Sequence, residues 1–270
     1  MDYDEKKRGL LEWAKAAAEE NMILAYSGGV DSSLLLKILT EAAKHNEKKV
    51  YAVLFQTELH PVREALEAEA LAKECGALYE VISCQGILEA GIEKNPMDRC
   101  YRCKSFLFDR ILDRAGELGI RTIVEGTNYD DLFVYRPGIK AIRERQVISP
   151  LAGFEMTKED VRRMAGEYGI RAGQKPSTPC LATRLPYGDT ITPEKLRQIE
   201  EAEQILRNEG FYNVRVRMHG NIARLEIDEE HFLTLMKDRR RVIGQLKKLG
   251  FRYVTLDLEG FRSGSMDLSG

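Results

Sequence analysis

Residues 27–33 and three of the cysteines carry residue types that could do chemistry. The stretch 27–33 places two adjacent glycines and one aspartate among three serines. It follows the apolar run 22–26 and precedes leucines at helical spacing, so we expect a strand, a tight turn and a helix. Glycines let the turn approach a ligand closely, and the helix start presents unpaired N–H groups to an anion. The pattern predicts a phosphate-binding loop made by Ser27, Gly28, Gly29, Asp31, Ser32 and Ser33.

The cysteines are the pair Cys100 and Cys103, with Cys180 far downstream. A C-x2-C spacing lets two thiolates face one centre. Three thiolates are one ligand short of a closed zinc site and of a fully ligated 4Fe-4S cluster, so a cluster held this way would leave one iron open to an external sulfide. Basic residues at 99, 102 and 104 favour the thiolate form.

Other interpretations of these cysteines stay open on spacing alone. They are a structural zinc completed by a histidine, a redox dithiol at 100 and 103, and unrelated thiols. We interpret Cys75 and Cys84 as ordinary buried thiols, since one lies in a predicted helix and the other at a strand end.

Alternating strands and helices must position these residues. After the first strand, apolar runs at 49–55, 77–82 and 121–125 are typical of buried strands, and helical spacing fills 61–75 and 101–118 between them. This order predicts an α/β fold with a parallel sheet. Ligands bind beyond the carboxyl ends of such strands, so we expect the loop 27–33, Thr57, Gly126 and Asn128 to converge, although Thr57 could equally do no more than end its strand.

The composition changes at residues 173–179, where two prolines lie within four residues. We place a domain border here, which gives a domain at 1–175 and a second at 176–270. The second domain has a helix at 193–207, alternating strands at 213–218 and 223–227, a helix at 229–248 and a strand at 253–258. It is predicted to be a small α+β domain that provides a surface for assembly into a homo-oligomer.

Composition excludes several classes of protein. The chain has 270 residues, 43% of them hydrophobic and 31% charged, with a net charge of −2. Neither half is strongly basic, which disfavours a nucleic acid as substrate. The first residues lack the apolar stretch of a signal peptide, and no apolar run is long enough to span a membrane. We expect a cytoplasmic protein that does not bind membranes.

The loop 27–33 lacks the spacing and the lysine of the common P-loop. It resembles the SGGxDS loop of the PP-loop ATP pyrophosphatases, which split ATP into AMP and pyrophosphate. A plain serine and glycine turn is the alternative, but five matched positions in a strand–turn–helix context favour the nucleotide loop. The resemblance implies that ATP is a cofactor.

Several motifs along nearly the whole chain resemble the LarE family of ATP-dependent sulfur transferases, which act in the synthesis of a nickel-pincer nucleotide cofactor. They are SGGVDSS, GTN-x-DD-L at 126–132, YRPG at 135–138, PCLATR-x-PYG at 179–188, RVRMHG at 215–220 and the terminal Phe261-Arg262-Ser263-Gly264-Ser265-Met266. The sequence departs from the family at Phe133-Val134, where an acidic residue is typical.

The resemblance implies a chemistry for the cysteines. In one branch of the family the cysteine matching Cys180 gives up its own sulfur and becomes dehydroalanine, whereas a second branch carries three cysteines and is similar to tRNA thiolases with a 4Fe-4S cluster. Cys100 and Cys103 place this sequence with the second branch. A 4Fe-4S cluster and a sulfide donor are therefore implied.

The remaining site residues would bind the metal and the substrate. Mg2+ would neutralise the pyrophosphate leaving group, with Asp31, Asp130 and Asp131 as candidate ligands, although Asp31 would also complement the helix start. The substrate would be a small nucleotide with a carboxylate. Arg184 is a candidate to face the anionic groups of this substrate. Arg215 and Arg217 share one strand face and could hold the substrate phosphate. The alternative is that this face is a solvated basic edge.

Two alternatives from other classes remain at this stage. A tRNA thiolase would use the same cluster chemistry but requires a basic surface for the nucleic acid. A zinc-binding module without catalysis would use the three cysteines as structural ligands.

Overall fold

The computed structural model describes residues 1–59, 62–170, 180–262 and 265–266. Internal contacts divide the chain into two compact units, Met1–Gly91 with Asp98–Ser177 and Ile92–Met97 with Thr178–Gly270. The predicted border between residues 175 and 176 lies outside the described residues. The segment 92–97 belongs to the second unit, an excursion that was not predicted from the sequence.

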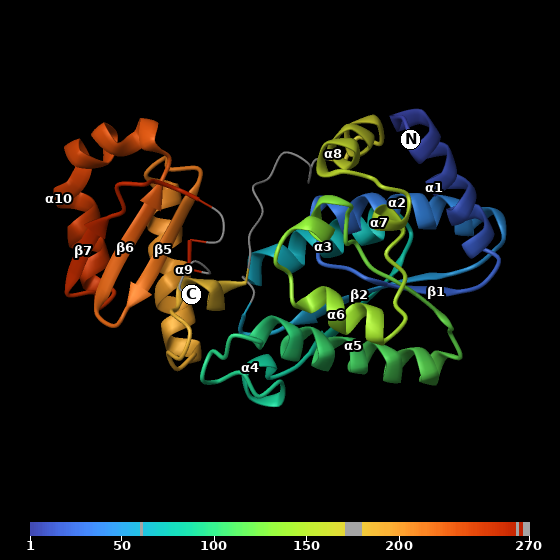
Figure 1. The fold of residues 1–270 in the computed structure, drawn as a ribbon, viewed down its shortest axis with the longest axis horizontal. Coiled ribbons are helices and arrows are strands. Elements are labelled where there is room, and N and C mark those ends of the chain that lie inside the picture. Colours follow the sequence, from blue (N-terminus) through green and yellow to red (C-terminus); the bar gives the residue numbers. More distant parts are fainter. Residues whose placement is uncertain (60–61, 171–179, 263–264, 267–270) are drawn as a thin grey trace. The chain divides into compact units, whose positions relative to one another are not determined.

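The first unit contains the parallel sheet that the alternating pattern predicted, with its strands in the order β3-β2-β1-β4 (Figure 1). The chain leaves β1 for β2 on one side and later returns to pair β4 with β1 on the other, so the switch in direction lies between β1 and β4. The strands are β1 (Met22–Ala25), β2 (Val50–Gln56), β3 (Leu78–Ser83) and β4 (Thr122–Val124).

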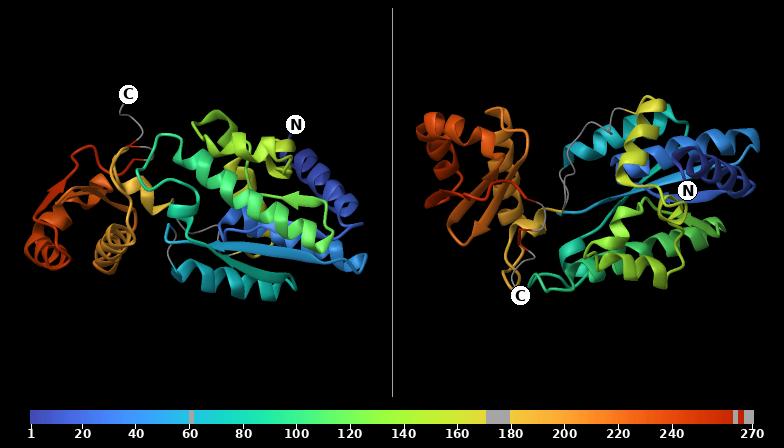
Figure 2. Two further views of the ribbon diagram at one scale, coloured as in Figure 1. Left: turned by 90° about the horizontal axis from the view of Figure 1, so that it is seen from below. Right: turned by 45° about the horizontal axis from the view of Figure 1, so that its top comes forward.

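Helices cover both faces of this sheet (Figure 2). They are α1 (Tyr3–Ala17), α2 (Val30–His45), α3 (Val62–Glu74), α4 (Gly86–Glu89), α5 (Arg99–Leu118), α6 (Gly138–Glu144), α7 (Pro150–Gly153) and α8 (Lys158–Glu167), with a 3-10 turn η1 (Asp130–Phe133).

The alternation of β1 shows how the sheet buries its two faces. Met22 and Leu24 point into a core formed with α1, α2 and α8, whereas Ile23 points into the opposite core with α5 and α6. All three side chains are fully buried. Burial on both faces explains the continuous apolar character of the strand and holds its carboxyl end, where loop 27–33 begins, on a rigid support.

The second unit is the small α+β structure that the sequence predicted. Its sheet has the order β5-β6-β7, with β5 and β6 antiparallel and β6 and β7 parallel. Its elements are η3 (Leu181–Arg184), α9 (Pro193–Asn208), β5 (Val214–His219), β6 (Ile222–Ile227), η4 (Glu229–His231), α10 (Phe232–Lys248) and β7 (Tyr253–Leu256).

The pairing register of β5 and β6 separates an apolar face from a charged one. Val216 is opposite Leu225, whereas Arg215 is opposite Glu226 and Arg217 is opposite Arg224. Because side chains alternate along a strand, the two arginines of β5 share one face with the charged residues of β6. None of the helices among the described residues is long and apolar enough to cross a membrane.

Candidate active site

The loop 27–33 is held by its own hydrogen bonds. Gly28 has a positive φ of 74°, a conformation that glycine adopts without strain. The hydroxyls of Ser27 and Ser32 are 3.1 Å apart, and that of Ser32 also donates to the carbonyl of Gly29 at 3.1 Å. The backbone N–H of Gly29 donates to Ser27 Oγ at 3.4 Å. These contacts fix the turn before any ligand binds.

The start of α2 is open to an anion. Gly29 is the N-cap of this 16-residue helix, and no side chain in the described part of the chain caps it. The first N–H groups of such a helix carry a partial positive charge. Ser33 is fully buried and donates its backbone N–H to the Gly29 carbonyl at 2.9 Å, so it supports the turn from inside. The loop has the backbone geometry of a phosphate site.

The turn after β4 meets the start of α2, as expected from the sheet order. A Cβ at Gly126 would lie 3.1 Å from the backbone nitrogen of Ser32 and 3.4 Å from the Cβ of Asp31. Only glycine permits this approach without a shift of the backbone. Asn128 Nδ2 lies 3.4 Å from Asp31 Oδ1, at the long end of a hydrogen bond. Gly126, Asn128 and the loop therefore converge.

Glu125 shapes this turn and was not predicted as a functional residue. It is 5% exposed and accepts hydrogen bonds from the backbone N–H and the hydroxyl of Thr127, at 2.9 and 2.8 Å. Its Oε1 also accepts from the hydroxyl of Ser149. The signal was present in the sequence as an acidic residue at the end of a buried strand, where a carboxylate requires partners.

Thr57 lies at the β2–β3 end of the same sheet edge. Its Oγ1 accepts from the N–H of Leu59 at 3.2 Å, and its Cβ lies 3.1 Å from the position of a Cβ on Gly86. An open pocket at this edge is lined by Gln56, Thr57, Glu58, Ser83, Cys84, Gln85 and Glu89. Thr57 is therefore placed among the residues that follow β2 and β3.

Lys158, which was not predicted from the sequence, joins two of the candidate metal ligands. Its ammonium forms an ion pair with Asp31, and its backbone N–H donates to Asp130 Oδ2 at 2.7 Å. Thr157 caps α8 in a reciprocal capping box with Asp160, which fixes the position of Lys158 at the first residue of the helix. Such a lysine gives no local sequence signal, because its partner lies 127 positions away.

Asp131 has a different environment. It is 9% exposed, accepts from the N–H of Asn128 at 3.3 Å and pairs with Arg136 at 3.0 Å. Burial raises the pKa of this carboxyl, and the arginine opposes that shift. Among the residues that the structure describes, no three acidic, histidine or cysteine side chains are grouped to hold a metal ion. Mg2+ commonly uses one or two carboxylates together with phosphate and water, so the donor set fits this ion.

Cys100 and Cys103 lie in the first turn of α5, three positions apart and so on one side of the helix. Both side chains are half-buried. Arg102, expected to favour the thiolates, is held by Asp98 at 2.9 Å. Cys75 and Cys84, predicted to be buried thiols, are half-buried, and this partial burial raises the pKa of each.

Cys180 precedes η3 in the second unit, and its side chain is also half-buried. Its carbonyl accepts from Thr183 Oγ1 at 2.8 Å and from Arg184 Nη1 at 3.3 Å. These bonds fix the backbone at the cysteine. The grouping of the three cysteines around one centre stays a prediction.

Arg184 is fully buried and pairs with Glu203 through two bonds, from Nε at 2.8 Å and from Nη2 at 3.1 Å. Glu203 also accepts from the N–H of Val216 at 3.1 Å and from Arg207 at 2.8 Å. Burial disfavours the ionised carboxylate, but the neighbouring arginines outweigh it and lower the pKa of Glu203. The guanidinium of Arg184 is thus engaged within the protein.

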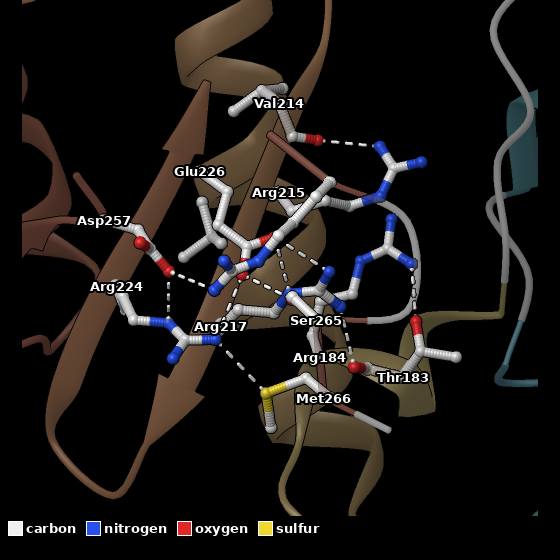
Figure 3. Close-up of polar contacts among 12 residues, drawn as sticks. Thr183, Arg184, Val214, Arg215, Arg217, Arg224, Glu226, Asp257, Ser265 and Met266 are labelled. Atoms are coloured by element: carbon white, nitrogen blue, oxygen red, sulfur yellow. Dashed lines mark hydrogen bonds and ion pairs between the residues drawn. The ribbon is translucent and has the colours of Figure 1, made fainter. Parts of the chain in front are cut away.

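The charged face of β5 and β6, together with Arg184 of η3, forms the arginine cluster shown in Figure 3, which we define as Arg184, Arg215, Arg217, Arg224 and Glu226. Arg217 donates to Glu226 Oε2 from Nε at 3.0 Å and from Nη2 at 2.8 Å, and to the Thr183 carbonyl at 2.9 Å. Arg224 Nη2 donates to Glu226 Oε1 at 3.0 Å. This network excludes the alternative of a solvated basic edge, because both arginines of β5 are less than 10% exposed.

Arg215 lies in the most positive part of the cluster. Burial, and after it the charge of Arg184, lowers the pKa of Arg215 to about 10. Its Nη1 donates to the Val214 carbonyl at 2.8 Å, and its guanidinium lies 5.0 Å from the ring centroid of Phe261. Both causes disfavour the charged guanidinium, and a bound anion would stabilise it.

The turn after the first strand of the parallel sheet has the sequence SGGVDSS, and it leads into an uncapped helix start at the switch between β1 and β4. These features define a PP-loop ATP pyrophosphatase domain. No protein-family model matches the chain. It is 37% identical over 92% of its length to the pyridinium-3,5-bisthiocarboxylic acid mononucleotide synthase of Lactiplantibacillus plantarum, covering 89% of that protein. It is also 38% identical to an uncharacterized Synechocystis protein, over 92% of both chains.

A more distant relative is a component of the glutamine-hydrolyzing GMP synthase of Methanoculleus marisnigri, with 29% identity over 71% of this chain and 65% of that protein. The chain belongs to the LarE family, the family of the pyridinium-3,5-bisthiocarboxylic acid mononucleotide synthase. The family predicted from the motifs is thereby confirmed, and the protein is an enzyme.

Proposed function

We propose that this enzyme uses ATP to adenylate a carboxylate of pyridinium-3,5-biscarboxylic acid mononucleotide and then replaces AMP with sulfur. The product would be a thiocarboxylate, an intermediate in the synthesis of a nickel-pincer nucleotide cofactor. The main support for the ATP step is the uncapped start of α2 at the Ser27–Gly29 turn, because the N–H groups there suit a pyrophosphate group. The name of the relative gives the bisthiocarboxylic product, and we infer the biscarboxylic substrate from it.

In the first step a carboxylate oxygen attacks the α-phosphorus of ATP. The bond from that phosphorus to the bridging oxygen breaks, and pyrophosphate leaves with the electron pair. Ser27, Gly28, Gly29, Ser32 and Ser33 form the cradle for the leaving group. Lys158 would supply positive charge beside it, and Thr57, Gly126 and Asn128 would border the nucleotide.

Asp31 and Asp130, with Asp131 nearby, are the residues that would hold Mg2+. When bound, this ion neutralises charge on the phosphates. Lys158 neutralises Asp31 in the free protein, which keeps the acidic edge from repelling an incoming polyphosphate. The loop 27–33 and Lys158 would therefore stabilise the pyrophosphate leaving group more than they stabilise the adenylate.

Sulfur would then attack the acyl carbon, and the bond from that carbon to the adenylate oxygen would break to release AMP. Cys100, Cys103 and Cys180 would hold a 4Fe-4S cluster, which supplies a site for external sulfide when bound. Thiolates are the ligands that such clusters use, so the residue type of all three fits this role.

The phosphate of the substrate would bind at the arginine cluster. The described charges around Arg215 include five arginines against three carboxylates, Arg184, Arg207, Arg215, Arg217 and Arg224 against Glu203, Glu226 and Asp257. A phosphate dianion would balance this excess, and guanidinium groups match its geometry. Arg184 would act through Glu203, which it fixes beside β5.

Anaerobic turnover with ATP, sulfide and the pyridinium mononucleotide tests the proposal. We expect stoichiometric AMP, pyrophosphate and thiocarboxylate, with iron and acid-labile sulfide in the purified protein. Mass spectrometry of the chain after turnover separates the two sulfur sources, because loss of hydrogen sulfide from Cys180 identifies the sacrificial route. Zinc in place of iron would contradict the cluster, and ADP in place of AMP would contradict the adenylation.

A further inference from the structure

The terminal motif 261–266 has no role in the proposed reaction, yet its described residues contact the arginine cluster. We define Phe261, Arg262, Ser265 and Met266 as the C-terminal strap. Gly260, with a φ of 70°, turns the chain here, and a Cβ at this position would lie 3.2 Å from the Ile227 carbonyl. The N–H of Phe261 then donates to that same carbonyl at 2.8 Å. The turn attaches the strap to the end of β6.

Two strap residues contact the network around Glu226 (Figure 3). Ser265 Oγ donates to Glu226 Oε1 at 2.6 Å, and Met266 Sδ lies 3.5 Å from Arg224 Nη2. Both residues are 9% exposed. Arg262 lies 3.5 Å from Asp257, the carboxylate that also lies 3.6 Å from Arg224. The strap is therefore packed against charged side chains of β6 and of the segment after β7.

Glu226 is fully buried and uses both carboxylate oxygens. Oε2 accepts from Arg217, whereas Oε1 accepts from both Arg224 and Ser265. Without the serine hydroxyl, Oε1 would keep the one bond from Arg224, and the carboxylate would be free to rotate toward it. Any rotation would move the oxygen that orients Arg217.

Phe261 supports the second arginine of β5. Its ring centroid is 5.0 Å from the guanidinium carbon of Arg215. A cation over a ring is attracted to its face, and the effect grows where water is excluded. Because burial, and after it the charge of Arg184, lowers the pKa of Arg215, an aromatic surface beside the guanidinium stabilises its charged form without neutralising it. The strap thus reaches both arginines, one by an aromatic contact and one through Glu226.

We propose that the C-terminal strap positions Arg215 and Arg217 for the anionic group of the substrate, with Ser265 acting through Glu226 and Phe261 acting directly. This inference rests on the proposed function, since it requires the cluster to bind the substrate phosphate. Ser265 and Phe261 are positioning residues and do not take part in the chemistry. The strap contacts lie in the second unit, whereas the loop 27–33 lies in the first.

Two truncations of the full-length enzyme form a matched pair. A chain ending at Met266 keeps every described strap contact, and a chain ending at Gly260 loses them all. The dissociation constants of the pyridinium mononucleotide and of ATP are measured separately by calorimetry. We expect the shorter chain to bind the mononucleotide at least ~10-fold more weakly, as loss of a hydrogen bond to a charged group implies, and to bind ATP within twofold of wild type.

Point variants keep the test informative if the shorter chain fails to fold. Ser265→Ala removes the hydroxyl, and Ser265→Thr retains it. We expect the alanine variant to raise KM for the mononucleotide about fivefold to tenfold while KM for ATP is unchanged, and the threonine variant to restore it. Phe261→Leu keeps the volume but not the ring and should weaken binding about threefold.

The outcomes separate the inference from the function on which it rests. Equal or tighter mononucleotide binding by the chain ending at Gly260 would overturn the inference, because the strap would then be inert or would cover the cluster. Equal loss of ATP and mononucleotide binding in Ser265→Ala would also overturn it, since that pattern indicates general destabilisation. If the wild-type enzyme binds ATP but not the mononucleotide, the proposed substrate itself is wrong.

Discussion

The loop 27–33 and the arginine cluster both suit phosphate groups, but they are built in opposite ways. The loop uses backbone N–H groups, a glycine turn and a helix start, with Lys158 as an added cation. The cluster uses side-chain charge, held by two buried carboxylates and a strap. A backbone site tolerates changes in surrounding charge, whereas a site of packed arginines depends on every counter-charge.

The largest effect is expected from Glu203, the carboxylate that pairs with Arg184 of the arginine cluster. Glu203→Ala leaves Arg184 buried without its carboxylate, and we expect a loss of about 3–5 kcal/mol in the free energy of unfolding. Urea denaturation provides the measurement. Glu201→Ala, an exposed change on the same helix, should cost less than about 0.5 kcal/mol. Similar losses in the two variants would show that the cluster does not depend on its counter-charge.

The loop should be sensitive to shape more than to charge. Gly126→Ala places a methyl group 3.1 Å from the Ser32 nitrogen, and we expect ATP binding to weaken about tenfold, or about 1.4 kcal/mol. Gly116→Ala is the matched control, because a Cβ there meets no described atom within 4 Å. That variant should bind ATP as wild type does. Normal ATP affinity in Gly126→Ala would remove this turn from the site.

Lys158 adds a charged side chain to the backbone groups of the loop 27–33, and in this respect the loop resembles the arginine cluster. Lys158→Met leaves Asp31 without its ion pair beside the phosphate cradle, so ATP affinity should fall about fivefold, equivalent to ~1 kcal/mol. AMP, which lacks the pyrophosphate, should lose less than twofold. Lys6→Met serves as the control, because it removes a comparable ion pair with Asp160, which lies on the same helix as Lys158. Equal losses for ATP and AMP would place Lys158 away from the leaving group.

The smallest effect concerns acid and the cap of α8. Burial opposes the ionised form of Asp160, but Lys6 and Thr157 outweigh it and lower the pKa of this carboxyl. Its stabilising contribution is therefore full above the unfolded pKa of about 4 and is lost as the pH falls through the lower folded pKa. The difference in unfolding free energy between wild type and Asp160→Asn should stay constant from pH 8 to 5 and shrink below about pH 4. A difference that grows in acid would contradict this assignment.

The strands, the longer helices and the convergence of the loop with Gly126 could be predicted from sequence, whereas the short helices α4, α6 and α7 were not predicted. Apolar runs and helical spacing report burial directly, and a parallel sheet fixes which strand ends meet. Several predicted bounds differ from the structure by one or two residues, as at β4 (Thr122–Val124).

Pairings between distant side chains could not be predicted. Lys158 with Asp31, and Arg184 with Glu203, depend on tertiary placement that no local pattern encodes. The strand period predicted that Arg215 and Arg217 share one face. It did not predict that this face is buried, because β6 and the strap cover it. The excursion of 92–97 into the second unit carried no signal in composition.

The central claim is that the substrate carboxylate attacks the α-phosphorus of ATP. Turnover with the pyridinium mononucleotide labelled with 18O in its carboxylates tests this most directly, with AMP, ADP and inorganic phosphate analysed by mass spectrometry. Attack at the α-phosphorus, followed by cleavage of the acyl carbon–oxygen bond, predicts one 18O atom in AMP. Label in inorganic phosphate, or formation of ADP, would contradict it.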